Sequence, residues 1–119
     1  MHTVNLNHAL SQIEQHWQPH IVGELNDQHV RLAKLSGEFI WHAHENADEL
    51  FLVLHGRLEM QFRDRTVRLD EGEFIIVPRG VEHCPRADQE CHVLLFEPAE
   101  TLNTGDVTSE RTVRDMKRI

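Results

Sequence analysis

The chain has 119 residues, enough for one domain with its own hydrophobic core and too few for two ordinary domains. Acidic residues outnumber basic ones by 20 to 12, and the net charge of −8 argues against nucleic-acid binding and against docking on an anionic membrane. Residues 1–10 lack the basic and apolar regions of a secretory signal, and no apolar run is long enough to cross a membrane. Because two Cys are too few for a disulfide scaffold, we expect a cytoplasmic protein with free thiols.

The N-terminal residues predict one short helix packed on the outside of the main body. Asn7 is the candidate N-cap, and Pro19 is expected to end the helix. Leu10, Ile13 and Trp17 are spaced so that they share one helical side.

From residue 28 to residue 98 the pattern changes to short apolar runs separated by Gly, Pro, Asp and Asn, which is typical of an all-β sandwich or barrel. The expected strands are His29–Leu35, Glu38–His44, Leu50–Leu54, Leu58–Phe62, Thr66–Leu69, Phe74–Val77 and His92–Phe96, and Glu82–Pro85 is a candidate for one more. The sequence thus predicts three parts: an N-terminal segment (1–27), a barrel (28–98) and a polar C-terminal tail or arm (99–119).

Two of the expected strands, Leu50–Leu54 and Phe74–Val77, are apolar on both faces, so their outer face needs a cover. The cover is either the N-terminal segment or a second subunit. Trp41 would also point outward if His42 points inward. We therefore expect a homodimer that buries part of this face.

The residues that carry chemistry gather in the stretch Gly37–Gly56. His42 and His44 are two residues apart, and in a strand such residues share a face with their Cα atoms about 6–7 Å apart. Two imidazoles at that spacing can bind one ion. Glu49 follows a polar turn and opens the next strand, so an antiparallel return can bring its carboxylate beside both imidazoles.

A second stretch, Gly72–His83, supplies one more imidazole. Its strand ends at Val77, and Pro78 and Gly80 then favour a tight turn. A fourth ligand, His83, could thus arrive from a different strand.

Together the two stretches resemble the two motifs of the cupin superfamily. The residues similar to the first motif are Gly37, His42, His44, Glu49 and Gly56, and those similar to the second are Gly72, Pro78, Gly80 and His83. The resemblance covers residues 28–98 and departs from the family at Ala87, where Asn is common. It implies a single-domain jelly-roll β-barrel in which His42, His44, Glu49 and His83 bind one divalent metal.

Three neutral imidazole nitrogens and one carboxylate suit Fe, Mn, Ni, Co, Cu or Zn and leave positions open for a substrate. The resemblance and this ligand set favour a metal-dependent enzyme for a small organic molecule. Oxygenase chemistry ranks first, and isomerase, cyclase or decarboxylase chemistry follows closely. The alternative is a non-catalytic cupin that holds a metal or small ligand as a sensor or store. The absence of a basic cluster counts against a phosphosugar substrate.

Two further pairs of residues have open interpretations. If Arg86–Gln89 formed a hairpin loop, His92 would lie opposite His83 on the inner face, either as an acid–base or metal-orienting group or as a hydrogen-bonded core residue. The same hairpin would place Cys84 opposite Cys91, either as two buried thiols or, under oxidation, as a disulfide that senses redox state.

Several apolar side chains should face the barrel interior, and those near its mouth could shape a substrate pocket. They are Ile40, Phe51, Met60 and Phe62. Arg79, in the turn before His83, could reach an anionic ligand or could lie in solvent.

Overall fold

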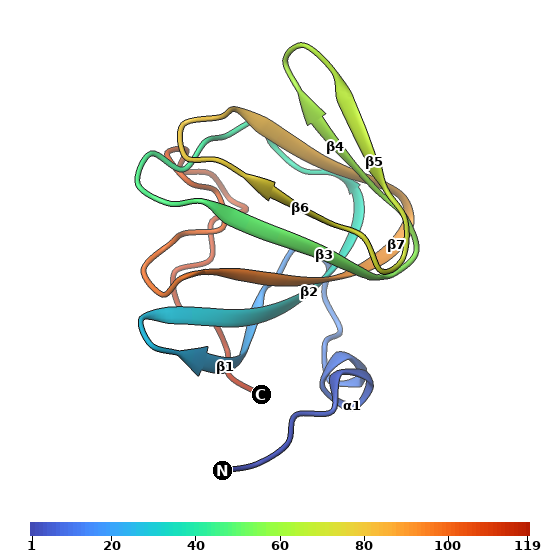
Figure 1. Ribbon diagram of the computed structural model, residues 1–119, viewed down its shortest axis with the longest axis vertical. Coiled ribbons are helices and arrows are strands. Elements are labelled where there is room, and N and C mark those ends of the chain that lie inside the picture. Colours follow the sequence, from blue (N-terminus) through green and yellow to red (C-terminus); the bar gives the residue numbers. More distant parts are fainter.

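The computed structural model describes residues 1–119 and shows an all-β barrel, which confirms the predicted fold class (Figure 1). Its helix and strands are α1 (Leu6–Ser11), β1 (His20–Leu25), β2 (Gln28–Glu38), β3 (Glu49–His55), β4 (Leu58–Phe62), β5 (Thr66–Leu69), β6 (Phe74–Val77) and β7 (His83–Pro98). All pairings between these strands are antiparallel. The strand order is β1-β2-β7-β3-β6, and β4 pairs with β7 and with β5.

Strand β7 crosses the whole barrel and pairs with β2, with β4 near its start and with β3 near its end. The hairpin considered at Arg86–Gln89 therefore does not form. The chain stays in one strand and takes up the extra residues in a bulge, because Leu35 pairs with Cys91 and Gly37 pairs with Ala87.

Without that hairpin, Cys84 and Cys91 are not opposite each other. Cys84 pairs with Gln61 on β4, whereas Cys91 pairs with Leu35 on β2. Both thiols are free and buried, and burial raises the pKa of Cys84 to about 11 and that of Cys91 to about 12. The cross-strand disulfide and the redox sensor built on it have no support in this arrangement, whereas two buried thiols fit it.

The expected strand at Glu38–His44 is also wrong. Strand β2 runs to Glu38, and Gly37 just before its end has a φ of +82°, which turns the chain out of the strand path. After that turn the backbone is irregular and makes one isolated bridge, between His42 and His83.

The N-terminal helix is shorter than expected and is capped by a different residue. The side chain of Asn5, not that of Asn7, accepts a hydrogen bond from the backbone N of His8 at 2.9 Å. The helix ends at Ser11, well before Pro19. The segment that follows contributes strand β1, which the sequence analysis missed.

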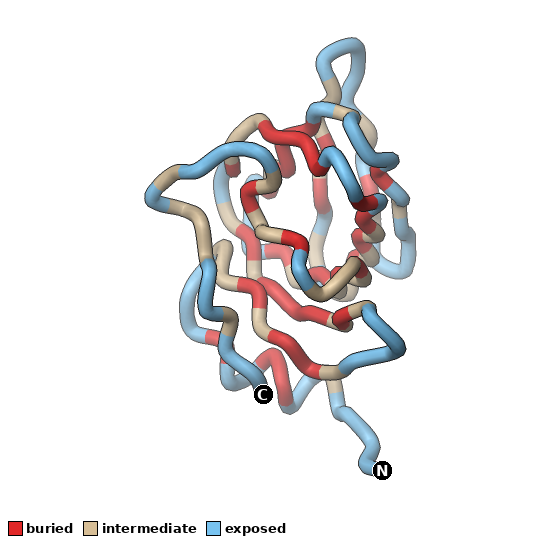
Figure 2. The backbone as a smooth tube through the Cα atoms, turned by 90° about the vertical axis from the view of Figure 1, so that its left-hand side faces the viewer, coloured by how far each residue is buried: buried red, intermediate tan, exposed pale blue.

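Two hydrophobic clusters lie on the two sides of the sheet, and buried positions follow the strands that line the barrel (Figure 2). The inner cluster includes Leu58, Met60, Val53 and Val93, all fully buried, and each such side chain stabilises the fold by about 1.5–3 kcal/mol. The outer cluster packs α1 against the sheet and comprises Ala9, Leu10, Ile13, Val22 and Leu32. The N-terminal segment therefore covers part of the outer face.

The C-terminal arm (residues 99–119) folds back along the barrel. Arg118 bridges to Ile21, and the backbone N of Ile119 donates to the Ile21 carbonyl at 3.0 Å. The fully buried Thr104 hydroxyl bonds the Thr112 hydroxyl at 2.7 Å. The arm is thus an ordered part of the body. No helix of the structure combines the length and hydropathy that a membrane crossing requires.

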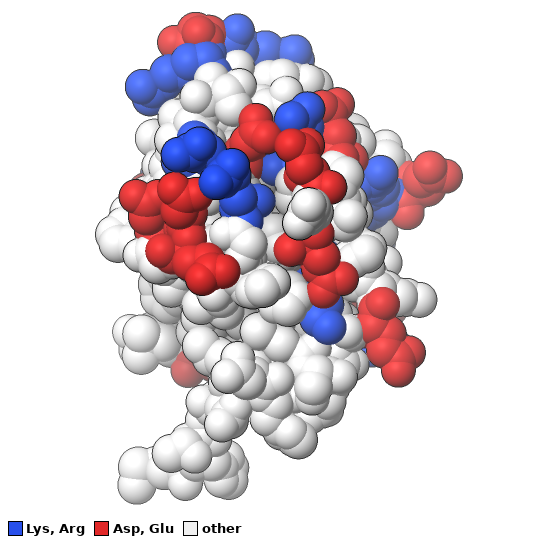
Figure 3. Space-filling view, turned by 90° about the vertical axis from the view of Figure 1, so that its right-hand side faces the viewer, with Lys and Arg blue, Asp and Glu red and all other residues white.

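Basic and acidic side chains lie side by side on the surface, as one face shows (Figure 3). Several arginines form ion pairs with nearby acids, including Arg57 with Asp70 and Arg63 with Glu82, both at 3.1 Å. These arginines are therefore partly neutralised and do not form a basic patch of their own.

Candidate metal centre

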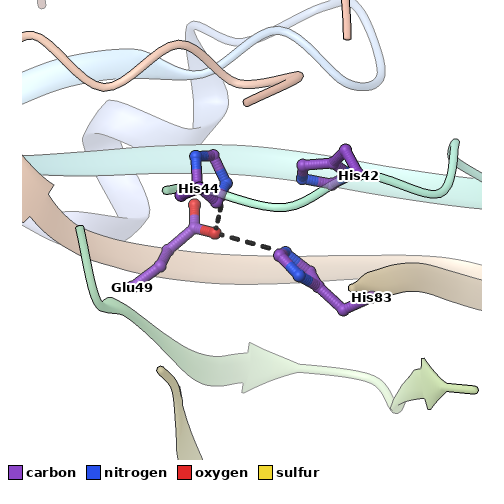
Figure 4. Close-up of side chains that lie close together, drawn as sticks. All are labelled: His42, His44, Glu49 and His83. Atoms are coloured by element: carbon purple, nitrogen blue, oxygen red, sulfur yellow. Dashed lines mark ion pairs between the residues drawn. The ribbon is translucent and has the colours of Figure 1, made fainter. Parts of the chain in front are cut away.

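The structure brings together all four residues predicted as metal ligands, inside the barrel and buried (Figure 4). His42 and His44 come from the irregular segment after β2, Glu49 opens β3 and His83 opens β7. Their ligand atoms all lie within 4.8 Å of one another. Ligand atoms that share one ion at about 2 Å are at most about 4 Å apart, so the cluster is close to a coordinating geometry.

Backbone hydrogen bonds hold the two ligand-bearing stretches side by side. His42 N donates to the His83 carbonyl at 3.0 Å, and His83 N donates to the His42 carbonyl at 2.9 Å. Gly80, whose φ is +79°, donates its N–H to the His44 carbonyl at 2.8 Å. The turn after β6 therefore places the His83 imidazole beside those of His42 and His44.

Backbone carbonyls also fix which nitrogen of two imidazoles faces the cluster. Nδ1 of His42 lies 2.9 Å from the Ile40 carbonyl, and Nδ1 of His83 lies 2.9 Å from the Val81 carbonyl. Because a carbonyl oxygen only accepts, each Nδ1 carries the hydrogen and each Nε2 keeps its lone pair. Metal-binding histidines are commonly oriented by such a bond from their other nitrogen.

Three buried atoms of the cluster have no hydrogen-bond partner: His44 Nε2, Glu49 Oε1 and His83 Nε2. The two nitrogens lie 3.1 Å and 3.6 Å from the Glu49 oxygen, without the alignment of a hydrogen bond. Since buried polar atoms are nearly always satisfied, three unpartnered atoms aimed at one another fit a cation among them. Nitrogen and carboxylate donors in this ratio suit a divalent transition metal.

Comparisons with known proteins agree with this architecture. The profile of the cupin domain matches residues 28–97, more than half of the chain. The chain belongs to the cupin family.

Three relatives of this cupin show how far the similarity extends. A cupin-2 domain protein from Shewanella frigidimarina is 43% identical, with a TM-score of 0.79 over 80% of this chain and 93% of that chain. Protein NMB1881 from Neisseria meningitidis is 32% identical, with a TM-score of 0.76 over 82% and 100%. The uncharacterized protein YdbB of Bacillus subtilis is 42% identical over 67 residues, which are 56% of this chain and 59% of that protein. These names state no activity, so function has to be argued from the site.

Glu49 has a buried acidic neighbour, Glu97, which the sequence analysis missed. Glu97 is 1% exposed and accepts a hydrogen bond from the fully buried Arg31 at 2.5 Å. Burial, and then the adjacent Glu49 carboxylate, raise the pKa of Glu97 well above its ordinary value. Burial would also raise the pKa of Glu49, but the adjacent Glu97 carboxyl and the imidazoles of His44 and His83 hold it well below its ordinary value. The two opposite shifts favour the protonated form of Glu97 and the anionic form of Glu49, the candidate ligand.

A small cavity of about 40 Å³ opens beside His42 and Glu49, and its wall is mostly apolar. Trp17 and Phe39 form one side, with their rings stacked 4.7 Å apart between centroids. Trp17 was expected on the helix, but its φ of +61° turns it toward the barrel. This volume holds only a few water molecules, which favours a compact ligand on this side of the cluster.

The five residues predicted for a substrate pocket lie in different places. Phe51 lines the cavity. Met60 is fully buried in the inner cluster, Phe62 packs against that cluster, and Ile40 is half-buried away from it. Arg79 lies in solvent, with its side chain 65% exposed. Phe51 is therefore the only one of the five that lines the cavity. Phe62 is paired with His83 between β4 and β7, and the Ile40 carbonyl bonds the His42 imidazole.

The prediction that His92 faces inward beside His83 is wrong. Val93 and Leu95 of β7 belong to the inner cluster, so strand alternation turns His92 to the outer side. There its Nε2 lies 2.8 Å from a carboxylate oxygen of Glu90. Nothing in this placement supports an acid–base role for His92 at the cluster.

We predict that acid destabilises the metal-free protein through His42. Burial, and then the neighbouring His83, lower the pKa of His42 from 6.5 to about 4. Between these values the unfolded chain takes up a proton that the folded His42 excludes, so the free energy of unfolding should fall with falling pH, by up to about 3 kcal/mol. Urea unfolding at several pH values measures this.

The variant His42→Asn should lose part of that pH dependence, and the surface variant His55→Asn should follow the wild type. A His42→Asn protein with the wild-type slope would contradict the assignment.

Proposed function

We propose that this cupin binds one divalent transition metal through His42, His44, Glu49 and His83 and acts as a metal-dependent enzyme on a small organic molecule. The convergence of three buried, unpartnered ligand atoms is the observation that supports the proposal. The ligand set suits Fe, Mn, Ni, Co, Cu and Zn, so it does not select among them. A cytoplasmic location stays a prediction.

A metal in this site would supply Lewis-acid or redox chemistry. The chain supplies the remaining functions. Bonds from Nδ1 to backbone carbonyls keep His42 and His83 aligned, and the Trp17–Phe39 wall excludes water and contacts the apolar part of a ligand. Glu97 holds the proton of the carboxyl pair, which leaves Glu49 free to ligate.

Among reaction types, oxygenation ranks first because an open site rich in imidazole with one carboxylate suits redox-active iron. Isomerisation, cyclisation and decarboxylation follow, since they need only a Lewis acid. The alternative is a cupin that binds a metal or small ligand without turnover. The observation that favours this alternative is the small cavity of about 40 Å³, which leaves little room for a substrate.

The metal assignment predicts that Glu49→Gln lowers metal affinity roughly tenfold or more while the barrel stays folded, because an anionic ligand is replaced by a neutral amide. Elemental analysis of protein purified from its native host, and of the variant, measures metal content. The control is Glu45→Gln, an exposed acid in the same segment, which should retain the metal. Full metal content in Glu49→Gln would refute the carboxylate assignment.

The enzyme assignment predicts O₂ uptake by iron-loaded protein with a compact substrate that offers two oxygen donors, and loss of uptake in His44→Ala. An oxygen electrode, with product analysis by mass spectrometry, follows the reaction across a panel of such molecules. Conversion without O₂ uptake would favour isomerisation, cyclisation or decarboxylation. Metal binding without any conversion would favour the non-catalytic alternative.

We also propose that this cupin is a homodimer joined through β6. Strand β6 pairs only with β3, and its Phe74 and Ile76 are 60% and 52% exposed. Trp41, also expected to face a partner, is instead covered by the Arg63 guanidinium, 3.9 Å from its ring centroid. Large exposed apolar side chains on an edge strand are typical of an interaction surface.

The homodimer predicts that Ile76→Asp converts a dimer to a monomer in analytical ultracentrifugation, because burying an unpaired charge opposes association. Val4→Asp, at an exposed position outside the sheet, should leave the dimer intact. A monomeric wild type would exclude the proposal.

A further inference from the structure

We propose that Asp106 and Gly105 of the C-terminal arm are positioning residues of the metal site, because they hold the backbone between His42 and His44. This inference rests on the proposed metal binding. It assigns to the arm, which lies outside the residues matched by the family profile, a part in building the site.

The segment His42–His44 needs support because it belongs to no strand. Its two ends are held from one side, by backbone bonds to His83 and Gly80. The middle residue, Ala43, is held from the other side. Its N–H donates to Asp106 Oδ1 at 3.0 Å, and its carbonyl accepts from the Asp106 N–H at 3.0 Å. Asp106, 63 residues further along the chain, thus bonds both the N–H and the carbonyl of Ala43, the residue between the two imidazoles.

Gly105 permits this approach. A Cβ at this position would lie 2.2 Å from the Ala43 carbonyl oxygen and 3.2 Å from Cδ2 of His42. Its φ of +57° is also one that glycine adopts most readily. The arm backbone therefore lies directly against the ligand segment and beside the edge of the His42 imidazole, which limits how far that ring can move.

The arm is itself anchored, so it can serve as a fixed support. Thr104 is fully buried and bonds the Thr112 hydroxyl. The Arg31 guanidinium donates to the Ala99 carbonyl at 2.8 Å and to the Thr101 carbonyl at 2.9 Å. The same guanidinium binds the carboxyl of Glu97 next to Glu49. One buried arginine therefore connects the start of the arm to the carboxylate side of the site.

Removing the Asp106 side chain would leave the Ala43 N–H without its partner and would free the segment that aligns two imidazoles. Groups outside the ligand set that orient metal ligands typically change metal affinity by about 10–100-fold when they are replaced. We therefore expect Asp106→Ala to weaken Co(II) binding about tenfold or more and to alter the visible absorption spectrum of bound Co(II).

Titration of the full chain with Co(II) tests this, using three variants. Asp106→Asn keeps the accepting Oδ1 and should retain the affinity and spectrum of the wild type. Glu110→Ala removes an exposed carboxylate from the same arm and should change neither. Amide hydrogen exchange at Ala43 in the metal-free protein should be faster in Asp106→Ala and unchanged in Asp106→Asn.

Wild-type affinity and spectrum in Asp106→Ala would overturn the inference. Equal losses in the Ala and Asn variants would overturn it too, because they would show that charge rather than the hydrogen bond matters. A wild-type chain that takes up no Co(II) or other divalent metal would instead refute the proposed function. In that case, unchanged amide exchange at Ala43 in Asp106→Ala would also exclude the positioning role of Asp106.

Discussion

The structure depends on the burial of three imidazoles and one carboxylate at a common point inside an apolar barrel. Burying polar groups without partners is unfavourable, by about 1–3 kcal/mol for each unsatisfied group. Three ligand atoms of this cluster are in that state. A bound cation would offset the desolvation of all four groups at once, so the feature that weakens the metal-free barrel is the one that would favour metal binding. The fold holds the candidate ligands together without a metal, so the barrel must be stable enough in that state.

That stability comes from layers around the site. Hydrophobic packing closes the barrel on its inner side, and α1 covers part of the outer face. The Arg31 guanidinium and the Glu97 carboxyl form a buried hydrogen-bonded pair behind Glu49, and two carbonyls at the start of the arm accept further hydrogen bonds of the guanidinium. Such a buried pair adds little stability by itself, but its directional bonds fix geometry. Here they fix the carboxylate ligand and the arm relative to each other.

Much of this could be predicted from the sequence, and what could not has physical reasons. Short apolar runs between turn residues predicted the bounds of β4, β5 and β6, and the spacing of His42 and His44 predicted two of the candidate ligands. The sequence suggested a hairpin at Arg86–Gln89 because the polar residues of a bulge have the same pattern as those of a turn. Glu97 follows Val93 and Leu95 at the two-residue spacing of the inward-facing positions, so strand alternation did indicate that Glu97 faces inward. Its significance depends on Arg31, 66 residues away, which no local pattern reveals.

The electrostatics of the cluster follow from the same burial. A metal competes with protons for its ligands, and that competition is weakest where the ligands are already in their metal-binding protonation states. Burial keeps His42 neutral down to about pH 4, and Glu97 takes the proton that Glu49 would otherwise hold. Two carboxyl groups buried separately would each become protonated, whereas in a buried pair one group can hold the proton while the other stays ionised. The second carboxyl, absent from the ligand motif, thus allows the first to stay an anion in an apolar interior.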